Sequence, residues 1–189
     1  ILLHRMGGLP LLAPLLASPV AAQPALAMRT VGLTFASTGN DPDVQARANA
    51  LKDGLRELGW VEGRNLRFEF RSMGNDPKAA AALAAELVAL APDVILSSGT
   101  VATVALHATT KTVPVVFVNV TDPVAGGFVA SLARPGGNMT GFTPFEYPIA
   151  GKWLDRLHDL APGLKRVALM GDPNNHNYKG FWGPFVQAA

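Results

Sequence analysis

The chain has no cysteine among its 189 residues. This absence excludes a disulfide framework, a thiolate nucleophile and a cysteine metal site. It also leaves no cysteine that could carry a lipid behind an export signal. We therefore expect the mature protein to be free in its compartment.

An excess of charge of one sign is missing as well. The 16 basic and 14 acidic residues nearly cancel, so no strong electrostatic field favours nucleic acid or an acidic partner. We predict that the protein has no nucleic-acid partner.

The common catalytic and nucleotide-binding motifs are also absent. No serine lies in a GxSxG elbow, and neither GxGxxG nor GxxxxGKS/T follows the first predicted strand. The four histidines lie far apart, and none has the HExxH spacing of a helical zinc site. These absences disfavour nucleotide binding, α/β-hydrolase chemistry and a metal site, and we predict no cofactor.

Residues 1–27 have the order of a secretory signal peptide. His4 and Arg5 precede an apolar run from Met6 to Leu16, which is followed by small residues that offer cleavage sites. Prolines interrupt the run, and it is shorter than the roughly 18 apolar residues that a membrane-spanning helix needs. We predict export to the periplasm with cleavage of this segment. A retained membrane anchor is the alternative.

The length after the signal suits one domain and part of another. About 160 residues would remain, which is more than a single well-buried domain of about 100–150 residues requires. The sequence begins with Ile1, and residues 187–189 read as the first turn of a helix. We therefore expect a fragment that is cut at both ends.

From Arg29 onward the apolar pattern alternates between strand and helix. Strands are predicted at 30–36, 65–72, 93–96 and 113–120, with amphipathic helices between them. Short loops between such elements imply parallel strands, right-handed crossovers and helices on both faces of the sheet. The fold class is therefore α/β with a doubly wound parallel sheet.

The alternation continues towards the C-terminus. We predict a weak helix after Asp122-Pro123 that runs through Leu132, a fifth strand at 138–143, a helix at about 149–160 and a strand at 166–170. The organisation is then an N-terminal α/β lobe at 28–143 and the start of a second α/β lobe at 144–189.

Hydroxyl, glycine and carboxylate residues gather where the predicted strands end. Ligands bind at the carboxyl ends of strands in open α/β sheets, and helix N-termini there favour an anion such as a carboxylate. Each residue could instead be an ordinary helix cap, but three loops converging on one edge favour a ligand site. The residues are Ser37 and Thr38 after the first strand, Ser97, Ser98, Gly99 and Thr100 after the third, and Thr121 and Asp122 after the fourth.

Two further polar features leave alternatives open. Asp122 is expected to pair with an amino group of the ligand, and the alternative is a general base. Asn174 lies in a polar turn of the second lobe with Asn175, Asn177 and Tyr178. This turn either faces the ligand or is solvated.

Several short motifs recur in a specific order. They are GLRELGWVEGRN at 54–65, LAAELV at 83–88, PDVI at 92–95, PVVF at 114–117, TDPV at 121–124 and LARPGGNMTG at 132–141. Together they closely resemble the ABC-transporter substrate-binding proteins of the tryptophan/tyrosine-binding type. The resemblance covers about residues 29–175.

The resemblance implies a periplasmic-binding-protein fold of the first type, in which two α/β lobes clamp a ligand between them. It implies capture of a small solute, often an amino acid, and its delivery to an ABC permease in the inner membrane. It also implies that the loops containing Ser37-Thr38, Ser98-Gly99-Thr100 and Thr121-Asp122 contact the ligand. We therefore expect a binding protein and not an enzyme. The alternatives are a ligand-binding sensor module of a signalling protein and, less favoured, an enzyme with Asp122 as base.

Overall fold

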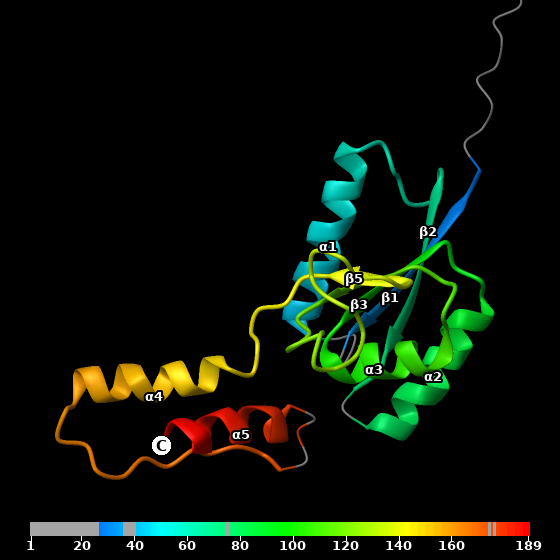
Figure 1. Ribbon diagram of the computed structural model, residues 1–189. Coiled ribbons are helices and arrows are strands. Elements are labelled where there is room, and N and C mark those ends of the chain that lie inside the picture. Colours follow the sequence, from blue (N-terminus) through cyan, green and yellow to red (C-terminus); the bar gives the residue numbers. More distant parts are fainter. Residues whose placement is uncertain (1–26, 36–40, 75, 174, 176) are drawn as a thin grey trace, which may run out of the picture.

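The computed structural model describes residues 27–35, 41–74, 76–173, 175 and 177–189 (Figure 1). Strands and helices alternate through most of the described chain, in the order β1 (Arg29–Phe35), α1 (Pro42–Glu57), β2 (Leu66–Ser72), α2 (Pro77–Ala89), β3 (Val94–Ser98), α3 (Thr100–Thr109), β4 (Val115–Val118), β5 (Met139–Gly141), α4 (Ile149–Leu160) and α5 (Tyr178–Ala188).

The strands form one parallel sheet in the order β2-β1-β3-β4-β5. The chain moves from β1 outward to the edge strand β2, then returns across β1 to β3. The strand order therefore reverses between β1 and β3, which is the point where open α/β sheets bind ligands. The predicted doubly wound parallel sheet is confirmed.

Helices cover both faces of the sheet, and each face has its own core. On one face, apolar residues of α1 such as Val44 pack against Leu33 and Phe35 of β1. On the other face, α2 and α3 pack on Ile95, Phe117 and their neighbours. Figure 1 shows α1 on the opposite side of the strands from α2 and α3. Burial on both faces explains why these strands read as nearly continuous apolar runs.

Two aspartates cap the helices that begin with proline. The Asp41 side chain accepts a hydrogen bond from the Asp43 N–H at 2.9 Å, and Asp76 accepts one from the Lys78 N–H at 3.0 Å. An acidic residue followed by proline satisfies the requirements of an N-cap and a first helical position.

The segment between α1 and β2 owes its conformation to Asn65, which is buried. Its side-chain oxygen accepts the Val61 N–H at 2.7 Å, and its amide donates to the Gly59 carbonyl at 3.0 Å. Gly59 and Gly63 have positive φ angles of 87° and 79°. The motif at 54–65 therefore builds a turn at the amino ends of the strands, away from the predicted ligand site.

The third and fourth strands differ in length from the prediction. β3 continues through Ser97 and Ser98, because Ser98 pairs with Phe35 and with Val118. The fourth strand stops at Val118, because Asn119 adopts a left-handed conformation with φ 56°. Ser97 and Ser98 therefore lie in a strand and not in a loop.

The helix predicted after Asp122-Pro123 is wrong, since residues 123–127 form turns and no helix runs through Leu132. Asp122 and Gly127 have φ angles of 45° and 72°, which a right-handed helix does not allow. Phe128 and Val129 are nevertheless buried in the core beside α3. The apolar residues that suggested a helix are thus anchors of a loop.

The predicted helix at about 149–160 is confirmed as α4, but the strand predicted at 166–170 is wrong. Residues 165–170 make no backbone hydrogen bond with another described segment, so nothing pairs with them as a strand. Helices α4 and α5 pack on each other, with the Trp153 and Phe181 rings stacked at 5.5 Å. Figure 1 shows this helical unit beside the α/β body, joined to it through residues 142–148.

Within the described chain, every helix is too short or too polar to cross a lipid bilayer.

Candidate functional site

The carboxyl end of β3 turns into α3 through a glycine with an unusual backbone. Gly99 is the N-cap of α3, with φ 101° and ψ 153°. This region of conformational space is essentially restricted to glycine. Because glycine has no side chain, the N-cap residue of α3 makes no side-chain hydrogen bond to the first turn of the helix. Its N–H groups are the kind that bind anions at helix N-termini.

Thr100 connects the β3 and β4 ends of the site. Its hydroxyl oxygen accepts a hydrogen bond from the Thr121 backbone N–H at 3.3 Å. Both threonines are buried, with 7% and 8% of their surfaces exposed. The Gly99 N–H in turn donates to the Val118 carbonyl at 3.0 Å. Residues 98–100 and 121–122, which were predicted to converge, therefore meet at one edge of the sheet.

The two serines of β3 have different environments. Ser97 is fully buried, and its hydroxyl lies 2.9 Å from the Thr103 hydroxyl and 3.4 Å from that of Thr34. It belongs to a hydroxyl chain between the sheet and α3, so its role is structural. Ser98 is the last residue of β3 and has 4% of its surface exposed. Of the two, Ser98 is the one at the end of the strand.

The Asp122 carboxylate holds two backbone segments. One oxygen accepts the Ala125 N–H at 3.0 Å, and the other accepts the Tyr147 N–H at 3.1 Å. Asp122 has 9% of its surface exposed and a φ of 45°. A carboxylate has further lone pairs, so these bonds leave acceptor capacity. Contact between Asp122 and a ligand stays a prediction.

Other predicted site residues lie outside the described residues. In the sequence, Ser37 and Thr38 come shortly after Phe35, the last residue of β1, and Asn174 comes shortly before Tyr178, the first residue of α5. Of the residues near Asn174 in the sequence, Asn177 accepts a hydrogen bond from the Tyr147 hydroxyl at 3.3 Å.

Aromatic residues that were not predicted as site residues line a cavity of about 260 Å³ in the helical unit. Trp153, Tyr178 and Phe181 form part of its wall, together with Asp172 and Asn175. The spacing of Tyr178, Phe181 and Trp182 is a helical pattern that was present in the sequence. What the spacing did not indicate is that the ring of Tyr147, far away in sequence, packs edge-on against Phe181 at 5.2 Å.

A second hollow lies at the other end of the sheet. A groove of about 440 Å³ between α1 and β2 is lined by aromatic and charged residues, including Trp60, Phe68 and Lys52. Lys52 is paired with Glu62 at 2.8 Å and lies 5.2 Å from the centre of the Phe68 ring. This groove lies near the amino ends of the strands, whereas open α/β sheets bind ligands at the carboxyl ends. We therefore do not assign the groove as the ligand site.

Burial and neighbouring charges explain the shifted pKa values of Tyr147 and His107, so neither shift indicates a catalytic role. Burial, followed by the charge of Asp122, raises the pKa of Tyr147, which keeps its hydroxyl protonated. Burial, followed by the charge of Lys111, lowers the pKa of His107, whose ring packs edge-on against Phe128 at 5.5 Å. Among the described residues, no group of three or more histidines and acids is placed to hold a metal ion.

Comparison with known proteins gives consistent results. The family model of the ABC transporter substrate binding protein matches residues 38–181. A tyrosine-binding protein of Clostridioides difficile (strain R20291) is 30% identical over 125 residues, which are 66% of this chain and 36% of that protein.

Two solved structures resemble the fold closely. One is a conserved domain protein from Vibrio cholerae, with a TM-score of 0.70, 27% identity and coverage of 86% of this chain and 53% of that one. The other is an ABC domain from Streptococcus pneumoniae in complex with L-Trp, with a TM-score of 0.69, 25% identity and coverage of 86% and 53%. The chain thus spans about half the length of these two structures and about a third of the curated relative.

Proposed function

The chain belongs to the ABC transporter substrate-binding protein family, and from that premise we propose that it is the solute-binding component of an ABC importer. It captures a small solute between two lobes and presents it to a permease in the inner membrane. The residues at 28–143 form the first lobe, and those at 144–189 begin the second.

The observation that carries this proposal is the link between Thr100 and Thr121. It brings the ends of β3 and β4 together next to the point where the strand order reverses. The groups that gather there are hydroxyls, backbone N–H groups and one carboxylate, which suit the recognition of a small polar ligand. The ligand contacts of the first lobe are Ser37, Thr38, Ser98, Gly99, Thr100, Thr121 and Asp122, and Asn174 contributes from the second.

We infer that the ligand is an amino acid or a related organic acid. Its carboxylate would lie at the amino end of α3, where backbone N–H groups and the helix dipole favour a negative charge. Its amino group would lie near the Asp122 carboxylate, which has further acceptor capacity. A tyrosine-binding relative and an L-Trp complex of another support an amino acid as the ligand class.

Transport by this route requires export, and the N-terminal segment is the support for it. Residues 1–27 are proposed to be a signal peptide that is cleaved to release the protein into the periplasm. An ABC permease is then the expected membrane partner.

Thermal unfolding tests the proposed ligand class. The complete gene product is heated with and without each member of a panel of amino acids and organic acids. A ligand that binds only the folded state stabilises the protein by about 2.7 kcal/mol when its free concentration is about 100 times its dissociation constant. Stabilisation by at least one amino acid is expected, and no shift with any member of the panel would contradict this ligand class.

The two alternatives predict other outcomes. An enzyme with Asp122 as base would turn a substrate over, and Asp122→Asn would abolish turnover while largely preserving binding. A sensor module would belong to a gene product that also carries a signalling domain. A ligand that is bound and released unchanged, by a protein without such a domain, favours transport.

A further inference from the structure

The connection from the sheet to the helical unit is tied to Asp122 by two hydrogen bonds. The Asp122 backbone N–H donates to the Phe145 carbonyl at 3.0 Å, and its carboxylate accepts the Tyr147 N–H at 3.1 Å. Thr143 also donates its hydroxyl to the Phe145 carbonyl at 2.7 Å. The backbone of this connection is therefore held against the sheet edge where the ligand site is proposed.

The side chain of Tyr147 makes contacts in the opposite direction. Its ring packs edge-on against Phe181 at 5.2 Å, and its hydroxyl donates to Asn177 at 3.3 Å. A Cβ atom added to Gly180 would overlap the Tyr147 ring, so the close approach of α5 depends on glycine at this position. Phe181 in turn stacks on Trp153 of α4 at 5.5 Å. Tyr147 thus contacts the interface between α4 and α5 through its ring and the sheet edge through its backbone.

Among the described elements, the extensive packing of α4 and α5 is with each other. None of the described helices and strands of the α/β body packs on them to a comparable extent. The contacts of Tyr147 are therefore well placed to decide the orientation of α4 and α5 relative to that body.

We propose that Tyr147 is the positioning residue that sets the orientation of the α4–α5 unit relative to the site at Thr121 and Asp122. The backbone N–H of Tyr147 is hydrogen-bonded to the Asp122 carboxylate, and the ring of Tyr147 packs on Phe181 of α5. A ligand that contacts Asp122 would change the orientation of the helical unit only if it binds one orientation more tightly than another. This ligand-linked half of the proposal rests on the proposed function, whereas the positioning role does not.

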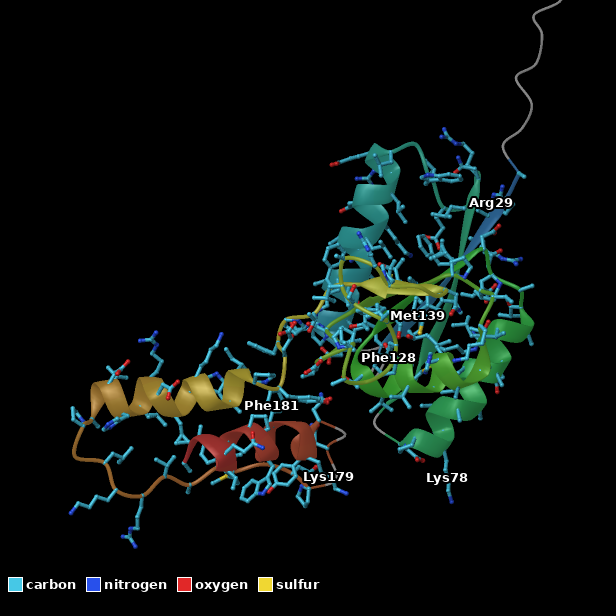
Figure 2. The ribbon with its side chains drawn as sticks, viewed as in Figure 1. Arg29, Lys78, Phe128, Met139, Lys179 and Phe181 are labelled. Carbon is cyan, nitrogen blue, oxygen red and sulfur yellow. The ribbon has the colours of Figure 1, made fainter. Side chains whose placement is uncertain are left out.

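A distance measurement without ligand tests the positioning role. Lys78 on α2 and Lys179 on α5 are exposed and lie in the two parts of the molecule, as Figure 2 shows. These 189 residues contain no cysteine, so Lys78→Cys and Lys179→Cys give two unique sites for spin labels. The measurement is made by double electron–electron resonance on the complete gene product, with any cysteine outside these residues replaced by serine.

The wild type is expected to give one narrow distance distribution, and Tyr147→Ala is expected to lose it. Phe142→Ala is the matched control, because Phe142 is an aromatic residue of the same connection with 75% of its surface exposed. A Tyr147→Ala distribution as narrow as that of the wild type, with the same centre, would overturn the proposal.

A second variant decides the question if Tyr147→Ala does not fold. Gly180→Ala adds a methyl group against the Tyr147 ring, whereas Gly183→Ala in the same helix adds one where no atom lies within 4 Å. A shifted distance in Gly180→Ala and an unshifted one in Gly183→Ala support the proposal. Equal distances in both variants and the wild type overturn it.

Adding L-tryptophan or L-tyrosine to the wild type separates the two proposals. A change in the distance distribution supports both the ligand class and its link to Tyr147. If Tyr147→Ala loses the narrow distribution but neither amino acid alters that of the wild type, the positioning role stands and these ligands fail.

Discussion

The hydroxyl of Thr100 accepts the backbone N–H of Thr121 at 3.3 Å, which joins the first residue of α3 to the segment that follows β4. Both residues are buried. This neutral hydrogen bond joins the two ends of the proposed ligand site, next to the bond from the Gly99 N–H to the Val118 carbonyl.

Replacing Thr100 by valine tests that bond with little change in shape. Thr100→Val leaves the Thr121 N–H without its buried acceptor, which costs about 1–3 kcal/mol of unfolding free energy. Thr109→Val in the same helix is the control, since Thr109 is exposed and its hydroxyl bonds only to the Ala105 carbonyl one turn earlier. Urea unfolding of the two variants should separate them, and equal losses would show that the Thr100 bond is unimportant.

Two glycines should respond to alanine in opposite directions. Gly99→Ala forces a side chain into the φ 101°, ψ 153° conformation, at a cost of about 1–3 kcal/mol. Gly54→Ala lies inside α1 with no atom within 4 Å of the added methyl group, so it should stabilise the protein by up to about 1 kcal/mol. Thermal unfolding measures both changes. A neutral Gly99→Ala would contradict the strained turn at the site.

Asn65 should be among the residues most sensitive to alanine outside the site. Asn65→Ala removes the acceptor of the Val61 N–H and the donor to the Gly59 carbonyl, with an expected loss of about 2–3 kcal/mol for a buried residue. Asn49→Ala, on the exposed surface of α1, should change stability by less than about 0.5 kcal/mol. Chemical denaturation of both variants checks the difference, and a small effect of Asn65→Ala would remove the structural explanation of the motif at 54–65.

Acid should weaken a contact at the amino end of β1. The Thr30 N–H bonds to Asp93 at 2.7 Å, and Arg29 lies beside it, so the hydrogen bond and then the guanidinium lower the pKa of this carboxyl. A carboxyl whose pKa is lower in the folded state stabilises the protein above its unfolded pKa of about 3.9. That stabilisation is lost as the pH falls through the folded pKa.

The Asp93 contribution is read from melting temperatures of the wild type and Asp93→Asn. The wild type should melt higher at pH 7, and the difference between the two proteins should shrink as the pH falls below about 4. A difference that is independent of pH would mean that the Asp93 charge does not contribute.

The sheet could be predicted from the sequence, because each strand is buried on one or both faces. The helices α1 and α2 also each have an aspartate cap and an apolar stripe. Asp41 and Asp76 are local signals, and local signals identify element starts well. The end of β3 could not be predicted in the same way, since it depends on the pairing of Ser98 with Phe35 and Val118.

The loop after β4 and the contacts of Asp122 were beyond a reading of the sequence for a similar reason. Phe128 and Val129 have helical spacing relative to Leu132, but the positive φ of Asp122 directs the chain into turns and these side chains into the core. The hydrogen bond of Asp122 to the Tyr147 N–H spans 25 positions. No periodicity reports a partner at that separation.

The proposed site at the ends of β3 and β4 is tested most directly by amide chemical shifts. The complete gene product, labelled with ¹⁵N, is titrated with L-tryptophan and separately with L-tyrosine. We predict that at least one of them causes changes concentrated at Ser98, Gly99, Thr100, Thr121 and Asp122, with little change around Trp60 and Phe68 in the groove between α1 and β2. Changes confined to that groove, or no saturable change with either amino acid, would contradict the account.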